Sequence, residues 1–100
     1  DAVNVNAQGG YYGNALQAAT EKGTEPIVRL LLERGADVNA KGGLYGNALQ
    51  AAAAEATEPV VRLLLERGAD VNAQGGYYGN ALQAASVNGT EPVVRLLLER

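Results

Sequence analysis

Five residue types are absent from this 100-residue sequence: histidine, cysteine, methionine, tryptophan and phenylalanine. Their absence removes thiol and imidazole nucleophiles, disulfides, and the thiolate and imidazole ligands of metal sites. Any catalytic site would therefore have to be built from carboxylates. We expect no enzyme activity, no cofactor and no metal site.

Long apolar runs and positive charge are also scarce. The apolar runs are short, such as the three leucines at 30–32, whereas a membrane span needs about 20 residues. Eight basic against eleven acidic residues give a net charge of -3, opposite in sign to surfaces that bind nucleic acids or anionic membranes. The composition, 47% hydrophobic and 19% charged, is typical of a globular protein. We expect a cytoplasmic protein with neither a nucleic acid nor a membrane as partner.

The sequence is built from a 33-residue repeat. Residues 42–50 echo residues 9–17 and recur at 75–83. The chain divides into three units, residues 2–34, 35–67 and 68–100, which we treat as one domain over residues 1–100. Units two and three differ at only six pairs of positions. The chain therefore contains little more sequence information than a single 33-residue unit does.

Each unit predicts two helices, as unit one shows. Leu16 and the alanines around it form one apolar helical face whose small side chains allow close approach of another helix. Gly23 favours the end of that helix and Thr24 can cap the next one. Pro26 suits a first helical turn, and from Ile27 the apolar pattern predicts a buried helix with a polar back.

Two further features of the repeat carry structural expectations. Because a single helix pair cannot hide its apolar surface, stacked pairs in a linear solenoid are expected. In unit two, Ala56 replaces the glycine found at Gly23 and Gly89. Either the first helix of that unit continues to Ala56, or Ala56 adopts a left-handed conformation that costs roughly 1 kcal/mol or more.

The residues resemble ankyrin repeats. The period is the family's, residues 35–40 (GADVNA) resemble its loop, and residues 60–68 (VVRLLLERG) resemble its second helix. The resemblance covers all three units and implies an all-α ankyrin-repeat solenoid of three 33-residue helix-turn-helix units that binds proteins. The chain departs from the family where Asn47-Ala48-Leu49-Gln50 stands in place of Thr-Pro-Leu-His. Asparagine can still cap the helix, and glutamine can donate and accept hydrogen bonds as histidine does. This variant resembles the ankyrin arrays of fungal innate-immunity-type receptors.

Other chemical signals favour structural explanations. Rows of glutamate and arginine on the second helices predict a solvated charged face rather than an acid/base pair. The Asn and Asp side chains of the loops lack the spacing of a calcium loop and predict turn hydrogen bonds. The glycine-rich turns lack the Lys-Ser/Thr of a phosphate-binding loop.

The positions that vary among the units predict a partner-binding surface, because stacking does not dictate them. They fall at the turn tips and at the ends of the first helices. Neutral variation at exposed sites explains the same pattern equally well. The candidate residues are Gln8, Tyr11, Glu21, Lys22, Lys41, Leu44, Ala54, Glu55, Gln74, Tyr77, Val87 and Asn88.

One turn position is tyrosine in every unit: Tyr12, Tyr45 and Tyr78. Tyrosine forms protein interfaces with little entropic loss, so a row of them could bind a partner. Because the residue is invariant among the units, we favour the alternative that these side chains pack on their neighbours and brace the turns.

Neither end carries a specialised capping unit, since units one and three keep the apolar face of the others. Solenoids need polar terminal faces to stay soluble alone. We therefore expect that units continue beyond both ends in a longer recognition domain, or that separate chains stack end to end. Two functions follow: a protein-binding array, or a structural or engineered repeat module that self-associates into oligomers, filaments or a lattice without a separate ligand. The near-perfect repetition suits recent duplication and consensus engineering equally well.

Overall fold

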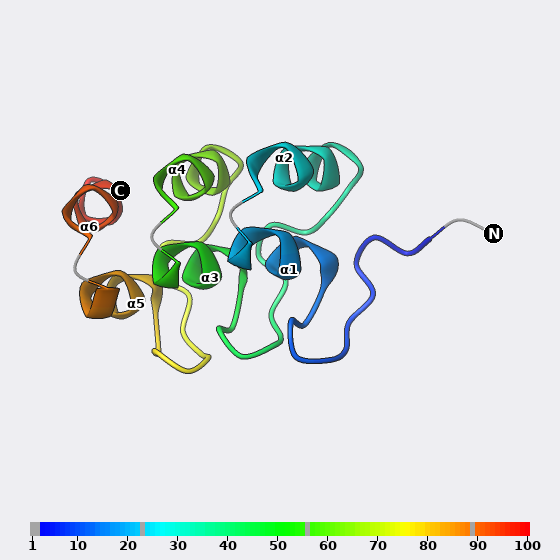
Figure 1. Ribbon diagram of the computed structural model, residues 1–100, viewed down its shortest axis with the longest axis horizontal. Helices are drawn as coiled ribbons and strands as arrows, with labels where there is room; N and C mark the ends of the chain where they lie inside the picture. Colours follow the sequence, from blue (N-terminus) through cyan, green and yellow to red (C-terminus); the bar gives the residue numbers. More distant parts are fainter. Residues whose placement is uncertain (1–2, 23, 56, 89) are drawn as a thin grey trace.

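The computed structural model describes residues 3–22, 24–55, 57–88 and 90–100, and these segments contain six helices and no strands. The first helices of the three units form one layer and the second helices form another, with the long turns projecting beyond the first layer (Figure 1). The molecule measures 43 × 23 × 20 Å. The all-α solenoid is confirmed. The helices are α1 (Ala15–Glu21), α2 (Glu25–Glu33), α3 (Ala48–Ala54), α4 (Glu58–Glu66), α5 (Ala81–Asn88) and α6 (Glu91–Leu98).

An asparagine cap begins the first helix of each unit, as the sequence predicts. The backbone of Asn47 is extended, with φ -158°, and its Oδ1 accepts a hydrogen bond from the Gln50 backbone N–H at 2.8 Å. Asn14 caps α1 in the same way. The side chain thus satisfies one of the N–H groups that a helix leaves free at its amino end.

The second helices begin differently from the prediction. Thr24, Thr57 and Thr90 occupy the cap positions, but none accepts a side-chain hydrogen bond from its helix. The Thr57 hydroxyl instead donates to the Ala52 carbonyl oxygen at 3.3 Å, so it is directed back to the preceding helix. The predicted proline in the first turn is confirmed. A glutamate stands beside it in each unit and complements the positive end of the helix dipole.

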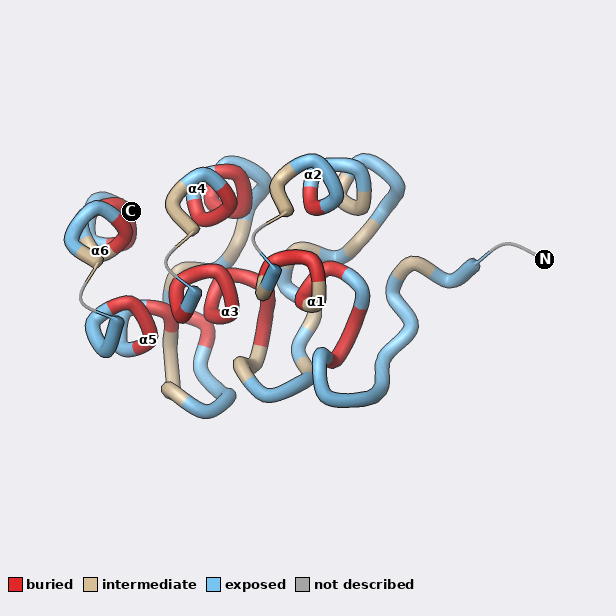
Figure 2. The backbone as a smooth tube through the Cα atoms, in the orientation of Figure 1, coloured by how far each residue is buried: buried red, intermediate tan, exposed pale blue. Residues whose placement is uncertain are grey.

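The core lies between the two helix layers and along the stack, and Figure 2 shows buried residues on the facing sides of both layers. All seven residues of α3 are buried, because α1 and α5 pack on either side of it and α4 packs above it. Leu49 and Leu64 are 1% and 0% exposed. Burial of a leucine side chain contributes about 1.5–3 kcal/mol.

One helix of unit one departs from the predicted buried pattern. Val28 is buried in α2, but Ile27 and Leu30 are 49% and 47% exposed. The equivalent residues of α4, Val60 and Leu63, are 1% and 2% exposed because α2 covers them. No described residue covers Ile27 and Leu30 in the same way, so identical sequence patterns are buried to different extents.

Close stacking of the turns depends on glycine. Gly43 has φ +67°, and a Cβ atom there would lie 2.6 Å from the Tyr12 carbonyl oxygen of the preceding unit. Residues 23, 56 and 89 lie outside the described segments, and with them the predictions for Gly23, Gly89 and Ala56. The described part of α3 ends at Ala54, and Glu55 occupies its carboxyl-terminal cap position.

Candidate partner-binding surface

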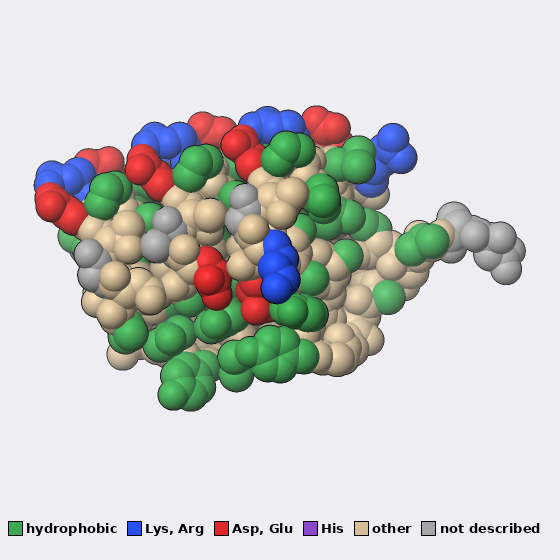
Figure 3. Space-filling view, viewed as in Figure 1, with side chains coloured by type: hydrophobic (Ala, Val, Ile, Leu, Met, Phe, Trp, Pro, Cys, Tyr) green, Lys and Arg blue, Asp and Glu red, His purple; other side chains and the backbone are tan. Residues whose placement is uncertain are grey.

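The predicted binding residues lie in two rows along one side of the molecule. We call the six residues at the tips of the long turns the turn-tip row, and all six are exposed. Figure 3 shows hydrophobic side chains along the lower edge of this side, with acidic and basic side chains above them. The turn-tip row consists of Gln8, Tyr11, Lys41, Leu44, Gln74 and Tyr77.

Backbone hydrogen bonds fix the spacing of the turn-tip row. The Leu44 N–H donates to the Tyr11 carbonyl oxygen at 3.2 Å, and the Tyr77 N–H donates to the Leu44 carbonyl oxygen at 2.9 Å. The side chains of Tyr11 and Tyr77 remain 61% and 73% exposed, and that of Leu44 remains 37% exposed. Three apolar side chains are therefore presented at one per unit on a regular backbone ladder.

The second row, which we call the helix-end row, lies at the ends of the first helices. Four of its residues are exposed and Glu21 is half-buried. Ala54, however, is 8% exposed, and its carbonyl oxygen accepts a hydrogen bond from the Asn88 side chain of the next unit. Because α5 packs against α3, the Ala54 methyl group is not available to a partner, and the prediction for its side chain fails. The helix-end row consists of Glu21, Lys22, Ala54, Glu55, Val87 and Asn88.

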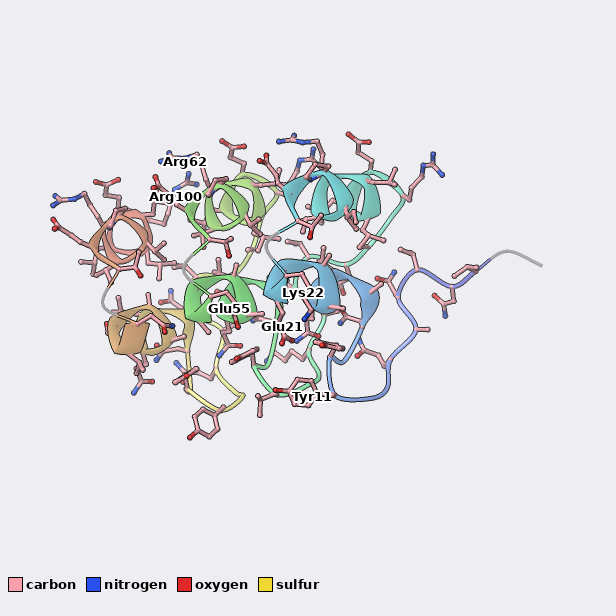
Figure 4. All side chains as sticks on the ribbon, viewed as in Figure 1. Tyr11, Glu21, Lys22, Glu55, Arg62 and Arg100 are labelled. Atoms are coloured by element: carbon pink, nitrogen blue, oxygen red, sulfur yellow. The ribbon has the colours of Figure 1, made fainter. Side chains whose placement is uncertain are left out.

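Glu21 and Glu55 come from consecutive units and lie close together at the ends of α1 and α3, with Lys22 beside them (Figure 4). Burial raises the pKa of the Glu21 carboxyl above its ordinary value, the negative charge of Glu55 raises it further, and Lys22 opposes the rise. This part of the surface therefore carries two carboxylates that repel one another, which a basic group of a partner would relieve.

Tyr45 connects this charged part to the turns. Its hydroxyl donates to Glu55 Oε2 at 3.4 Å. Burial, and then the negative charge of Glu55, raise the pKa of Tyr45 to about 12. The phenol therefore keeps its proton to a higher pH than an ordinary tyrosine does.

The invariant tyrosines pack on neighbouring aromatic rings. Tyr45 stacks on Tyr78 of the next unit, with ring centroids 6.0 Å apart and an interplanar angle of 6°. Tyr77 meets Tyr78 edge-on at 5.0 Å, and Tyr11 meets Tyr12 edge-on at 5.2 Å. These contacts fit the bracing role, and each exposed tyrosine of the turn-tip row has one edge-on aromatic contact.

Sequence reasoning did not identify the residues that join one unit to the next. Gln17 and Gln50 are 1% and 2% exposed. Their Nε2 atoms donate to the carbonyl oxygens of Gly42 and Gly75, at 2.6 and 2.7 Å. The sequence did point to this position, because glutamine replaces the family's histidine there. The atom that accepts the hydrogen bond is a backbone oxygen 25 residues away, however, and no pattern of side chains indicates it.

Two structural features bear on other functions. In the described segments, no helix is both long enough and apolar enough to span a bilayer. In the same segments, no three acidic side chains gather where they could share a metal ion.

Stacked helix pairs with a copied core define a helical-repeat protein of the solenoid class. The family described as "Ankyrin repeats (3 copies)" matches residues 2–75, and the chain belongs to the ankyrin repeat family. Ankyrin repeats generally mediate protein–protein interaction and are typically not catalytic. A 33-residue segment, 33% of the chain, is 61% identical to the azaphilone pigments biosynthesis cluster protein L of Monascus ruber. The chain spans 7% of the length of that fungal protein.

Proposed function

We propose that the chain is a non-catalytic array that binds a protein partner through the turn-tip row and the helix-end row. One observation carries the proposal: eleven of the twelve candidate residues, whose positions vary among the units, are exposed or half-buried along one side. Most positions of the core are copied from unit to unit, although the core also includes Ala54 of the helix-end row. Variation concentrated on one accessible side is the pattern expected of a surface that reads a partner.

The chemistry of the two rows suits a partner with both apolar and charged groups. Tyr11, Leu44 and Tyr77 offer apolar contact area, and tyrosine loses little conformational entropy when it is buried in an interface. Glu21 and Glu55 favour a basic group of the partner at the ends of the first helices. We therefore infer a protein segment that places a lysine or arginine beside apolar side chains, in a cytoplasmic setting without nucleic acid or membrane.

Rigidity of the array supports tight binding. The turn tips are joined by backbone hydrogen bonds, and the units are joined by the buried Gln17 and Gln50. A surface that is ordered before binding avoids part of the entropic cost of association.

The experiment compares two triple variants in a binding assay with a partner isolated by photo-crosslinking. In the first, Tyr11, Leu44 and Tyr77 are replaced by serine. In the matched control, three exposed residues of the second helices, Glu33, Glu66 and Glu99, are replaced by glutamine. We expect the first variant to lose binding and the control to keep it. The opposite result would place the binding surface on the second helices and overturn the proposal.

A second candidate function is self-association of the chain without a separate ligand. The observation that favours it is the exposure of apolar residues at both ends of the stack, including Ile27 at 49% and Leu98 at 68%. Concentration-dependent assembly of the purified chain would support this function, and retention of a monomer at high concentration would contradict it.

A further inference from the structure

The middle of the candidate surface stays accessible although a unit packs on each side of it. Leu44 lies between the turns of units one and three and is 37% exposed. Glu55, at the end of α3, is also exposed. Backbone hydrogen bonds join Leu44 to Tyr11 on one side and to Tyr77 on the other. The accessible surface is therefore a property of the interior of the stack, and it continues from one unit to the next.

The turns repeat at a short distance along the stack. The Leu44 N–H bonds to the Tyr11 carbonyl oxygen at 3.2 Å, so standard bond lengths place the two Cα atoms no more than about 7 Å apart. The rings of Tyr45 and Tyr78, at equivalent positions of consecutive units, give an independent measure. Their centroids are 6.0 Å apart and their planes are nearly parallel. Both measures describe one turn tip for each step of this length.

This step matches the repeat of an extended polypeptide. Side chains on one face of a β-strand recur at every second residue, about 6.4–6.8 Å apart. Four residues of an α-helix also rise about 6 Å, but every fourth side chain is rotated by about 40° from the one before it. Three such side chains of a helix therefore turn by about 80° around its axis, whereas those of an extended segment stay on one side.

A segment laid along the turns has the helix-end row on its other side. Tyr45 connects the two rows, since its hydroxyl donates to Glu55 Oε2 at 3.4 Å. Glu55 lies close to Glu21, with Lys22 beside them (Figure 4), and two carboxylates against one ammonium leave a negative charge. Lys41, in contrast, belongs to the turn-tip row. A positive group of a partner is therefore favoured on the helix-end side and not on the turn-tip side.

We propose that the partner binds through an extended segment that runs along the stack. Apolar side chains at its positions i, i+2 and i+4 contact Tyr11, Leu44 and Tyr77. A basic side chain between the two that contact Tyr11 and Leu44 points to the other side, where it meets Glu21 and Glu55. Alternate side chains of an extended chain point in opposite directions, so one segment serves both rows. The inference rests on the proposed binding function and specifies the conformation and the order of side chains of the partner.

Three fluorescein-labelled synthetic peptides of equal length test the proposal by fluorescence anisotropy with the 100-residue chain. The first has leucine at i, i+2 and i+4, arginine at i+1 and i+3, and serine elsewhere, so that it fits in either direction. The second has the same composition, with its leucines at i, i+4 and i+8. The third is the first peptide with both arginines replaced by glutamine.

We expect the first peptide to bind about tenfold more tightly than either of the others, a difference that titration resolves. Equal or tighter binding of the second peptide overturns the extended conformation. Equal binding of the third overturns the basic contact. If the first peptide does not bind at its highest soluble concentration, the whole inference is overturned.

Variants of the chain locate the contact. Leu44→Ser should weaken binding of the first peptide about tenfold, whereas Glu66→Gln, an exposed residue of α4, should leave it unchanged. The double variant Glu21→Gln/Glu55→Gln should bind the arginine and glutamine peptides equally. A merely structural effect would weaken both peptides and keep the difference between them, which overturns the pairing. Far-UV circular dichroism checks that each variant is folded.

The outcome for this inference is separable from that for the proposed function. Suppose that the peptides fail while the photo-crosslinked partner still needs Tyr11, Leu44 and Tyr77. The binding surface is then retained, and only the extended segment is overturned. Loss of the partner's dependence on these three residues would overturn both.

Discussion

Gln50 Nε2 donates to the carbonyl oxygen of Gly75 at 2.7 Å, and this bond joins the first helix of unit two to the turn of unit three. The side chain is 2% exposed, so water does not compete for the same acceptor. Asn47 caps the helix on which Gln50 lies and fixes the position of the amide. Local helix capping and contact between units are therefore combined in a four-residue segment.

Replacement of Gln50 by alanine should lower the free energy of unfolding by about 1–3 kcal/mol, because it leaves the Gly75 carbonyl oxygen without its partner. Gln83 is the matched control: it has the same neighbours in sequence but is exposed. Gln83→Ala should change the stability by less than about 0.5 kcal/mol. Urea unfolding followed by circular dichroism measures both. Equal losses for the two variants would mean that the bond between units contributes nothing.

Gly76 and Gly10 separate backbone strain from steric overlap, because both have φ +71°. Alanine at Gly10 should cost about 1–2 kcal/mol for the left-handed conformation alone. Alanine at Gly76 should cost about 1–3 kcal/mol more, because its Cβ atom would overlap the Tyr45 carbonyl oxygen of the preceding turn. Thermal and urea unfolding give the comparison. If the two variants are equally stable, the turns are not held together as closely as the structure shows.

The same leucine position should tolerate truncation differently in consecutive units. Leu49→Ala is expected to cost about 2–5 kcal/mol, because it opens a cavity between three helices. Leu82→Ala should cost clearly less, since that side chain is already 39% exposed. Unfolding is measured at a protein concentration at which the chain is monomeric. A Leu82 variant as unstable as the Leu49 variant would show that exposure does not govern the effect.

The Tyr45 phenol should titrate with a pKa of about 12, in place of its ordinary value of 10.0. A raised folded-state pKa favours the protonated form, so this contribution to stability is present below pH 10 and is lost as the pH rises through about 12. Glu55→Gln should lower the pKa of Tyr45 only in part, because burial is the larger cause.

Absorbance at 295 nm follows the titration, and Tyr45→Phe identifies the signal of this residue. Circular dichroism over the same range shows whether the chain stays folded. Identical Tyr45 titrations in the wild type and in Glu55→Gln would contradict the contact between the two side chains.

Much of the local structure could be predicted from the sequence. The 33-residue period, the asparagine caps and the prolines of the second helices indicate where the helices lie, because these signals act within one or two turns of chain. The prediction that threonine caps the second helices was wrong. The Thr57 hydroxyl bonds to the preceding helix, and its direction depends on how the two helices pack.

The candidate surface was predictable in outline only. The variable positions do lie on one side, but Ala54 is covered by the next unit, and a small side chain at a variable position gives no sign of its burial. The pairing of Tyr45 with Glu55 joins the turn to the helix end of one unit, ten residues apart, and no helical or strand periodicity relates the two.

The sequence by itself determined the units, their helices and the residues available for the core, since these follow from propensity, capping and apolar periodicity. Only the tertiary structure decided which copy of each residue is buried. Leu49 and Leu82 have the same local sequence but are 1% and 39% exposed, because burial depends on a neighbouring unit and not on the residues alongside in the chain. For the same reason, Gln50 joins two units whereas Gln83 lies exposed at the end of the stack.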